Sequence, residues 1–426
     1  MYRRIFLLII TVIFCTQHLS AQQNFPADTI AMNISQAEKL FLAGNFQLLV
    51  AKYEISASDA AILQSRLYPN PNLSVDQGAY NPMNKKWFDT SPNGETSASL
   101  QQVIILAGKR NKQINIAKIN SQISSYQFYD LVRTLRYEMR ISFYGLYFLR
   151  ESISVYDREI ESLKSLIDVY TDQYKKGNVA FKELARLQSL QFTLENERSE
   201  LMKDASEKQA NLSLLTGDTL SKTIKPVLDR GDIINTDLSQ INYAQLIDSA
   251  LVNRPDLLIA KSQVDLSQSN LALQKSLRIP DVTLGANWDR QGSYIYNYNS
   301  LSLAIDLPFW NRNQGNVKMA GYRVEESKLS QSLSEQQVKN DIKKAYVELS
   351  ETDRLYKSAS SQFNSDYEKL LDGIVRGYQN HTISLLEFID YYETYKTSKI
   401  EFNRLQNNRM NAVEEINLAV GSTVLK

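Results

Sequence analysis

The placement of proline constrains this chain more than any other feature of its sequence. The nine prolines lie at positions 26, 69, 71, 82, 92, 226, 255, 280 and 308, so residues 93–225 and 309–426 contain none. A proline inside a helix costs about 3 kcal/mol, and both proline-free runs are rich in the helix formers Glu, Lys, Leu and Gln. Each run therefore predicts very long helices.

Apolar side chains recur along the first run at the spacing of a coiled coil. The stripe steps alternately by four and three residues through Leu149, Ile153, Tyr156, Ile160, Leu163, Ile167, Tyr170 and Tyr174. A helix over residues 109–174 would be roughly 100 Å long at about 1.5 Å per residue, which exceeds any compact domain. Each run is interrupted once, at residues 175–178 and 377–381, where Gly or Asn can take a positive φ. Two antiparallel helical hairpins are predicted.

Internal similarity indicates that the chain is a tandem repeat. Residues 45–52 (NFQLLVAK) align with residues 254–261 (RPDLLIAK), and Gly217 aligns with Gly421 near the end of each copy. We predict a first repeat over residues 22–217, a linker or equatorial segment over 218–240, and a second repeat over 241–426. Each repeat is expected to hold a helix, a β-hairpin and a long helical hairpin, whose tips lie near residues 177 and 381.

Each repeat contains one stretch with strand character, at about residues 72–105 and 281–307. In the second stretch, aromatic and aliphatic residues alternate on opposite faces: Tyr294, Tyr296 and Tyr298 on one, Leu301, Leu303 and Ile305 on the other. Four strands cannot close a barrel, and an open sheet cannot lie in lipid with unpaired edges. Several chains are therefore expected to contribute strands to one barrel, and three chains would supply twelve.

Aromatic residues gather in these two stretches. All three tryptophans, Trp87, Trp288 and Trp310, lie in or beside them. Outer-membrane barrels carry aromatic residues at both ends of the lipid-facing band, so we predict that these tryptophans, with Tyr294, Tyr296 and Tyr298, mark the membrane interface. The alternative is that tryptophans mark any strand-rich region.

The first residues predict export. Arg3 and Arg4 precede an apolar stretch, and Leu19, Ser20 and Ala21 form a small-residue cleavage site. Residues 1–21 are therefore predicted to be a signal peptide that is removed without a lipid anchor. No later segment approaches the roughly 18 consecutive apolar residues of a membrane-spanning helix.

Composition excludes several functional classes. Removing residues 1–21 takes two of the 48 basic residues and the only cysteine, leaving 46 basic residues against 47 acidic ones. This near neutrality gives no support to nucleic-acid binding. One histidine remains, His381, so a histidine-based metal site or a Ser-His-Asp triad is not expected. We predict that the chain is not an enzyme and that it holds no cofactor or resident metal.

These features together resemble the TolC-type outer-membrane efflux proteins. The resemblance rests on the export signal, the tandem repeats, and the glycine turn within residues 174–184 (YKKGNVAFKEL). Residues 67–73 (LYPNPNL) and 106–110 (LAGKR) are similar to the branch that exports cobalt, zinc and cadmium. The resemblance covers essentially the whole mature chain.

The resemblance implies a mainly α-helical homotrimer in the outer membrane. Its coiled-coil tunnel would extend into the periplasm beneath a twelve-stranded β-barrel. The tips would dock a periplasmic adaptor (membrane fusion) protein that belongs to an inner-membrane pump, most often of the RND type. Such a duct passively exports small solutes, including divalent metal cations or drugs.

The resemblance also implies two sets of site residues. The tips that contact the adaptor would be Gly177, Asn178, Val179 and Ala180, and His381, Thr382, Ile383 and Ser384. His381 departs from the family pattern, because glycine is usual at its position. Glu387 and Asp390 lie three residues apart on one helix face and fall where the family has an acidic periplasmic gate. Six carboxylates around a threefold axis should raise some pKa values and attract cations; the alternative is a solvated surface patch.

Three further interpretations stay open from the sequence. The same fold serves as the outer-membrane duct of type I protein secretion systems. A periplasmic coiled-coil scaffold that never enters a membrane would share the long helices but would not need the strands. Lys109 and Arg110 either hold the junction between strands and helices or simply begin a solvated helix.

Overall fold

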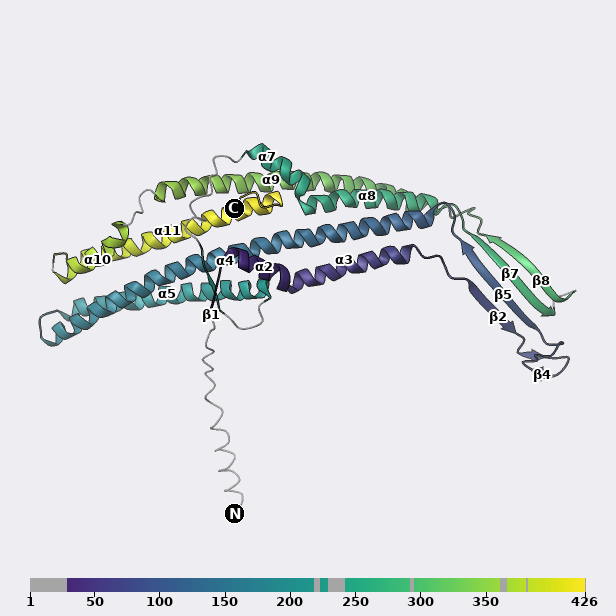
Figure 1. Cartoon of the computed structure of the whole chain (residues 1–426), viewed down its shortest axis with the longest axis horizontal. Helices are drawn as coiled ribbons and strands as arrows, with labels where there is room; N and C mark the ends of the chain where they lie inside the picture. The colour runs from purple at the N-terminus through teal and green to yellow at the C-terminus, as the bar shows by residue number, and fades with distance from the viewer. Residues whose placement is uncertain are drawn as a thin grey trace, which may run out of the picture.

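The computed structural model describes residues 29–217, 223–228, 242–291, 295–360, 366–380 and 382–425. It is a long, bent molecule in which a helical arm runs from two hairpin tips to a β-sheet at the opposite end (Figure 1). No helix in the described part of the chain combines the length and the hydropathy that a membrane span requires. The predicted signal peptide, Tyr294, His381 and the predicted linker other than residues 223–228 lie outside the described residues.

Two helical hairpins form the arm. The first joins α4 (Lys109–Lys175) to α5 (Phe181–Thr216), and the second joins α9 (Gln314–Ser360) and α10 (Asp366–Gln379) to α11 (Leu385–Val420). The 67 residues of α4 match the predicted helix to within one residue at its C-terminal end. Most of the predicted stripe is buried, whereas Tyr174 at its end is 43% exposed and packs on Phe181. The prediction of a mainly helical fold with long antiparallel hairpins is confirmed.

Shorter helices continue the hairpins towards the sheet. They are α2 (Ile34–Gly44) and α3 (Phe46–Ser65) in the first half, and α7 (Tyr243–Asn253) and α8 (Pro255–Ser276) in the second. Asn45 caps α3 and also donates from Nδ2 to the Leu215 carbonyl at the end of α5, at 2.9 Å. In the second half Arg254, at the start of α8, makes the corresponding bond by donating to the Ala419 carbonyl of α11 at 3.3 Å, although its side chain does not cap α8. Both halves thus join their helices end to end in the same way.

Left-handed glycines make these two junctions tight. Gly217 has a φ of +68° and Gly421 a φ of +81°. A Cβ on Gly217 would lie 2.1 Å from the Gly44 carbonyl oxygen, so no other residue fits there without a backbone shift. This explains why the repeat aligns at these two positions.

The sheet consists of four antiparallel strands. They are β2 (Asn72–Gln77), β5 (Thr96–Ile104), β7 (Val282–Gln291) and β8 (Tyr296–Ile305), and their order is β2-β5-β7-β8. The two halves of the chain therefore pair in the middle, where β5 meets β7. The predicted stretches 72–105 and 281–307 contain these strands.

Two short strand pairs were not predicted. A parallel pair joins β1 (Thr29–Met32) to β6 (Thr223–Pro226) beside the arm, and a small hairpin joins β3 (Tyr80–Asn81) to β4 (Lys86–Trp87) between β2 and β5. Pairing between β1 and β6 brings together residues almost 200 positions apart, which no local pattern reveals.

Candidate functional site

The first hairpin tip is a tight glycine turn. Gly177 has a φ of +79° and its amide donates to the Tyr174 carbonyl at 2.9 Å, while the Asn178 amide donates to the Gln173 carbonyl at 3.0 Å. Nothing lies within 4 Å of the position that a Cβ on Gly177 would take. Gly177, Asn178 and Ala180 are exposed, and Val179 is partly buried against the helical core. The tip therefore presents backbone and small side chains to the outside.

The second tip closes by side-chain capping. Thr382 donates from both its amide and its hydroxyl to the Gly377 carbonyl, at 2.9 and 2.8 Å. Ser384 then caps α11: its hydroxyl accepts from the Glu387 amide at 3.2 Å, and Glu387 Oε2 accepts from the Ser384 amide at 2.8 Å. Ile383 is partly buried, as Val179 is in the first tip.

One aromatic stack joins the two hairpins near their tips. The Tyr170 and Tyr378 rings are 5.5 Å apart and nearly parallel, and Phe388 stacks on Tyr378 at 4.7 Å. Tyr392 continues the row at 5.2 Å from Phe388. These rings belong to one buried cluster that draws on α4, α5, α10 and α11. The two tips are thus held together by a shared core.

Glu387 and Asp390 lie on the exposed side of α11, whereas Phe388, next to Glu387, faces the core and is 1% exposed. The hydrogen bonds from Ser384 hold the pKa of Glu387 below its ordinary value. Within one chain, the capping box therefore favours the ionised form, in the opposite direction to the repulsion expected in a ring. Both carboxylates are available to face copies of themselves.

A buried acid lies deeper in the same core. Glu159 of α4 is 0% exposed, and neither of its carboxylate oxygens has a hydrogen-bond partner in the described part of the chain. Lys396 of α11 lies beside it, but its ammonium is 2.7 Å from both Glu197 and Glu393. Burial raises the pKa of Glu159 to about 8; Lys396 opposes the shift, and Glu393 and Glu197 add to it. Glu159 therefore favours the protonated form at neutral pH.

The strand register gives the sheet two chemically different faces. Residues that pair across neighbouring strands lie on the same face. One face carries Leu73, Val75, Leu100, Ile104, Val282, Leu284, Leu301, Leu303 and Ile305. The other carries Ser74, Ser97, Ser99, Gln101, Asn287, Ser300 and Ser302. Leu100 and Leu284 on the two central strands are 49% and 48% exposed, and Leu301 on the edge strand β8 is 89% exposed, so the described chain leaves the apolar face largely uncovered.

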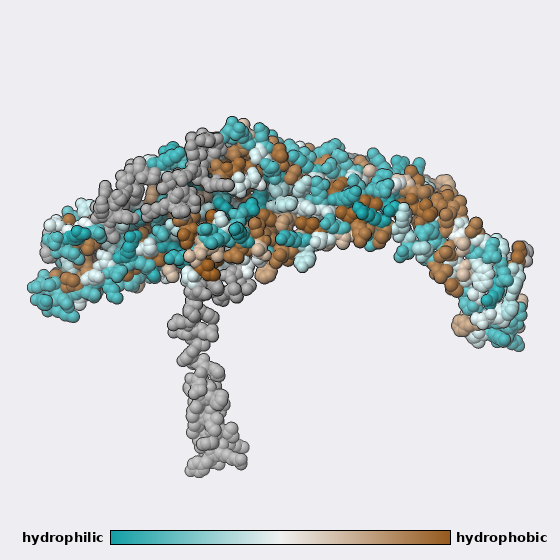
Figure 2. Space-filling view, in the orientation of Figure 1, coloured by the Kyte–Doolittle hydropathy of each residue, from teal (hydrophilic) through white to brown (hydrophobic). Residues whose placement is uncertain are grey.

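The aromatic residues that were predicted to mark the membrane interface lie on different faces and at different ends of the sheet. Trp288 pairs with Asn299 and lies on the apolar face, whereas Tyr296 and Tyr298 lie on the polar face. Trp310 follows β8 where the sheet meets the arm, and Trp87 lies at the far end. Hydrophobic residues also gather on the surface where the arm meets the sheet (Figure 2).

The junction between sheet and arm is held by Lys109. Its side chain is 5% exposed, and Nζ lies 2.7 Å from Asp281 Oδ1, which also accepts from the Leu106 amide at 2.9 Å. Arg110 lies over the Tyr68 ring at 4.0 Å and donates to the Arg66 carbonyl. Burial by itself would raise the pKa of Asp281. The Lys109 ammonium and the Leu106 amide outweigh this effect and hold the pKa of Asp281 below its ordinary value. Of the two interpretations of these cations, the structure favours the junction.

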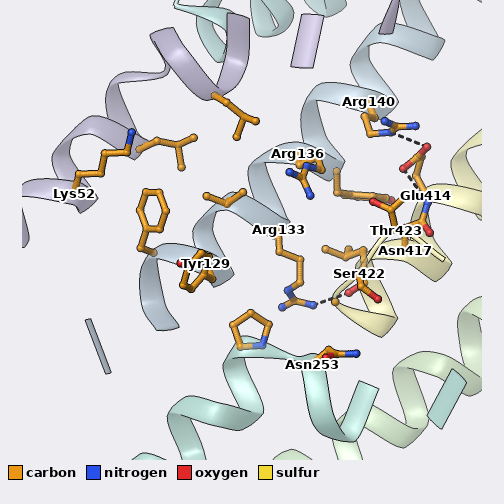
Figure 3. Close-up of a pocket in the computed structure, with 18 residues that line it drawn as sticks. Lys52, Tyr129, Arg133, Arg136, Arg140, Asn253, Glu414, Asn417, Ser422 and Thr423 are labelled. Carbon is orange, nitrogen blue, oxygen red and sulfur yellow. Dashed lines mark hydrogen bonds and ion pairs between the residues drawn. The ribbon is translucent and has the colours of Figure 1, made fainter. Parts of the chain in front are cut away.

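Arginines line a cavity in the middle of the arm, between α3, α4 and the ends of α7 and α11 (Figure 3). Arg140 Nε lies 2.8 Å from Glu414 Oε1, and Arg133 donates to the Leu418 carbonyl at 2.7 Å. Arg136 Nε lies 2.8 Å from Glu38. Arg133 and Arg140 thus join α4 to α11 of the second half, whereas Arg136 joins α4 to α2 within the first half. In the described part of the chain, no group of three His, Cys, Asp or Glu residues is placed to hold a metal ion.

The comparison with protein families is decisive. The sequence profile of the outer membrane efflux protein family matches residues 39–218 and 246–422. The chain belongs to this family. It is therefore an outer-membrane protein from a family of efflux channels, which are not enzymes, and the resemblance described above is confirmed.

Two curated relatives are similar to this chain over more than half of its length. The cobalt-zinc-cadmium resistance protein CzcC of Cupriavidus metallidurans is 22% identical over 298 residues, which cover 70% of this chain and 68% of CzcC. The probable outer membrane lipoprotein SilC of Salmonella typhimurium is 23% identical over 280 residues, which cover 61% of this chain and 57% of SilC.

The fold of this efflux protein matches a solved channel. The Campylobacter jejuni CmeC outer membrane channel superposes with a TM-score of 0.75 at 15% identity, covering 92% of this chain and 86% of that chain. At this identity the likeness concerns the fold: helical hairpins attached to a small sheet.

Proposed function

We propose that this protein is the passive exit duct of a tripartite efflux system. Three copies join their four-stranded sheets into a twelve-stranded barrel in the outer membrane, and their helical arms form a tunnel through the periplasm. A periplasmic adaptor protein docks on the tips and connects the duct to an inner-membrane pump of the RND type.

The two-faced sheet is the observation that carries this proposal. Within the described residues, β2 and β8 each have a neighbour on one side only, so both edges are open. Open edges leave backbone groups unpaired in lipid and promote aggregation in water, and a large exposed apolar face is unstable in water. Closing three sheets into a ring satisfies the edges, turns Leu301 and its neighbours towards lipid, and turns the serine-rich face towards a wet lumen.

In the proposed barrel the aromatic residues would lie in different environments. Trp288 would face lipid, while Trp310 and Trp87 lie at opposite ends of the sheet, as an aromatic girdle at each interface requires. Tyr296 and Tyr298 share the face of Ser300 and Ser302, so they would line the lumen instead. Tyr294 stays a prediction for the interface.

The tips supply the contact with the adaptor. Gly177, Asn178, Val179 and Ala180 on one hairpin and His381, Thr382, Ile383 and Ser384 on the other are the proposed docking residues. In the described part of both tips, one aliphatic residue packs inward and small or polar groups face outward, which leaves the outer surface free for a partner.

Glu387 and Asp390 are the proposed gate. Threefold symmetry would gather six carboxylates at the narrow end of the tunnel, where they would favour cations over anions. The cargo is proposed from the relatives: CzcC is named for resistance to cobalt, zinc and cadmium, so small solutes that include divalent metal cations fit best. Family membership argues against the non-membrane scaffold, and no feature of the chain favours protein secretion.

Single-channel recording in planar bilayers tests the proposal. Wild-type protein should conduct weakly and prefer cations, and the double variant E387A/D390A should conduct more and lose that preference. The matched control is D204A/E207A, which removes an exposed pair at the same spacing on α5 and should behave as wild type. Unchanged conductance and selectivity in E387A/D390A would contradict the proposed gate. The absence of conductance in every form would contradict the proposed duct.

A further inference from the structure

The loop between β2 and β5 has its polar residues inside. Asp89 is 5% exposed, and its Oδ2 accepts hydrogen bonds from Asn81 Nδ2 at 2.9 Å and Asn84 Nδ2 at 3.0 Å. Its Oδ1 accepts from the Ser91 amide at 3.1 Å. These bonds, with that from Asn84 the strongest influence, hold the pKa of Asp89 well below its usual range. The interior of the loop is thus a satisfied polar network.

The outer surface of the same loop is apolar. Met83 is 91% exposed, Trp87 71% and Phe88 64%. Met83 lies in the turn of the small β3–β4 hairpin, Trp87 in β4 and Phe88 directly after it, at the end of the sheet farthest from the arm (Figure 1). Single exposed apolar residues need no explanation, but three large ones on one turn mark a contact surface.

The backbone fixes this surface in place. Lys85 has a φ of +49° and Phe88 a φ of +47°, conformations that side chains other than glycine rarely adopt. Such strain persists only where the surroundings enforce it, and it concentrates at functional positions. Here the Phe88 amide donates to the Ala79 carbonyl at 2.9 Å, and a Cβ on Gly94 would lie 1.6 Å from the Asp89 carbonyl oxygen.

The loop is also tied to the other half of the chain. Arg290 of β7 donates to the Thr90 carbonyl at 2.7 Å, and the Tyr296 hydroxyl donates to the Pro92 carbonyl at 3.0 Å. The surface is therefore held on the end of the sheet and moves with it.

Positive charge accompanies the apolar residues. Lys85 and Lys86 are exposed, and neither forms an ion pair within the described part of the chain. Lysines next to a tryptophan suit the boundary of a bilayer, where the indole lies at head-group depth and ammonium groups meet phosphates. A stable protein interface needs about 800 Å² from each partner, more than one short turn presents.

We propose that this turn is a binding site for anionic lipid: Met83, Trp87 and Phe88 enter the outer surface of the membrane, and Lys85 and Lys86 bind lipid phosphates. The site deepens the proposed function and rests on it, because the far end of the sheet meets lipid only if the sheet forms a barrel. It would fix the depth and rotation of each chain in the bilayer.

Fluorescence quenching of the full chain in vesicles tests the site. The variant W288F/W310F leaves Trp87 as the sole tryptophan. It is reconstituted in phosphatidylcholine vesicles in which a minor, brominated component is either phosphatidylglycerol or phosphatidylcholine. Brominated phosphatidylglycerol should quench Trp87 severalfold more, and high salt should reduce the difference because screening weakens attraction between exposed charges.

Charge variants show whether Lys85 and Lys86 bind anionic lipid or whether Trp87 merely lies near the membrane. In the same background, K85Q/K86Q should abolish the preference for the anionic quencher, whereas K343Q/K344Q, an adjacent exposed pair on α9, should keep it. Equal quenching by both lipids, or quenching by neither because Trp87 faces water or protein, overturns the proposal while leaving the barrel intact. Protein that fails to enter the vesicles, shown by flotation after a carbonate wash, contradicts the barrel and this site together.

Discussion

The helical arm and the sheet bury their apolar residues very differently. Leu163 and Phe388 in the arm are 0% and 1% exposed, whereas Leu73 and Leu301 in the sheet are 68% and 89% exposed. The arm finds its packing partners within one chain, and the sheet does not. The arm of one chain therefore contains a packed core of its own, whereas the apolar face of the sheet would be covered only in the proposed barrel, by lipid and further copies.

Truncating an arm residue should give the largest loss of stability. Phe388→Ala removes the ring that stacks on Tyr378 and Tyr392, and burial of this kind is worth about 3–5 kcal/mol. Urea unfolding followed by helical circular dichroism measures the change. Phe192→Ala, at a side chain that is 67% exposed on α5, is the control and should change the free energy of unfolding by less than about 0.5 kcal/mol. Similar losses in the two variants would contradict a packed arm.

A charge introduced on the apolar face of the sheet should reduce insertion of the protein into the membrane. Leu301→Arg places a cation on the apolar face and should cost about 2–4 kcal/mol per chain in insertion, seen as loss of carbonate-resistant membrane protein. Ser300→Arg, one residue away on the polar face, should insert normally. Equal insertion of the two variants would show that the faces do not differ as the register requires.

Glu159 should make the arm less stable as pH rises. Its pKa is about 8 in the folded chain against 4.5 for the free side chain, so the folded state holds a proton that the unfolded state has lost. Stability therefore falls between these two values. Glu159→Gln should remove this slope and gain about 2 kcal/mol at pH 8 relative to pH 6. Parallel pH profiles for wild type and variant would mean that Glu159 is ionised in the fold.

The junction should respond to pH in the opposite direction, and more weakly. The pKa of Asp281 is lowered in the fold, so its contribution is present above the ordinary pKa and is lost as pH falls through the folded value. Asp281→Asn, which leaves Lys109 without its counter-ion, should cost about 1 kcal/mol at neutral pH and nothing in acid. Thermal unfolding at both pH values checks this, and a constant cost across pH would rule out the ion pair.

Local sequence patterns predicted the helices of the arm, but they did not predict the contacts between those helices. Missing prolines and the heptad stripe gave α4 almost to the residue, and Gly177 marked the first tip because only a left-handed turn fits there. The Ser384–Glu387 capping box was readable in the sequence as S-x-x-E but was not used. The burial of Glu159 could not be predicted, because it depends on packing against α11, whose Tyr392 hydroxyl donates to the Glu159 carbonyl from 233 positions away.

The sheet shows the same limit. Alternation in residues 301–305 predicted the apolar face, whereas the pairing of β5 with β7 is a tertiary choice. The β3–β4 hairpin was missed because it contains only two residues in each strand, too few for a period to be recognised. Its order comes from Asp89 and its amide partners rather than from strand propensity.

Disulfide cross-linking between chains tests the closed barrel most directly. The only native cysteine is Cys15, within the predicted signal peptide, so pairs of cysteines can be introduced along β2 and β8 and oxidised in membranes. Scanning the positions of β2 against those of β8 covers every register. A closed barrel of three chains should give some pairs that yield covalent dimers and trimers and nothing larger, because such a ring leaves no free edge. Monomers alone at every pair, or a ladder that continues beyond the trimer, would contradict it.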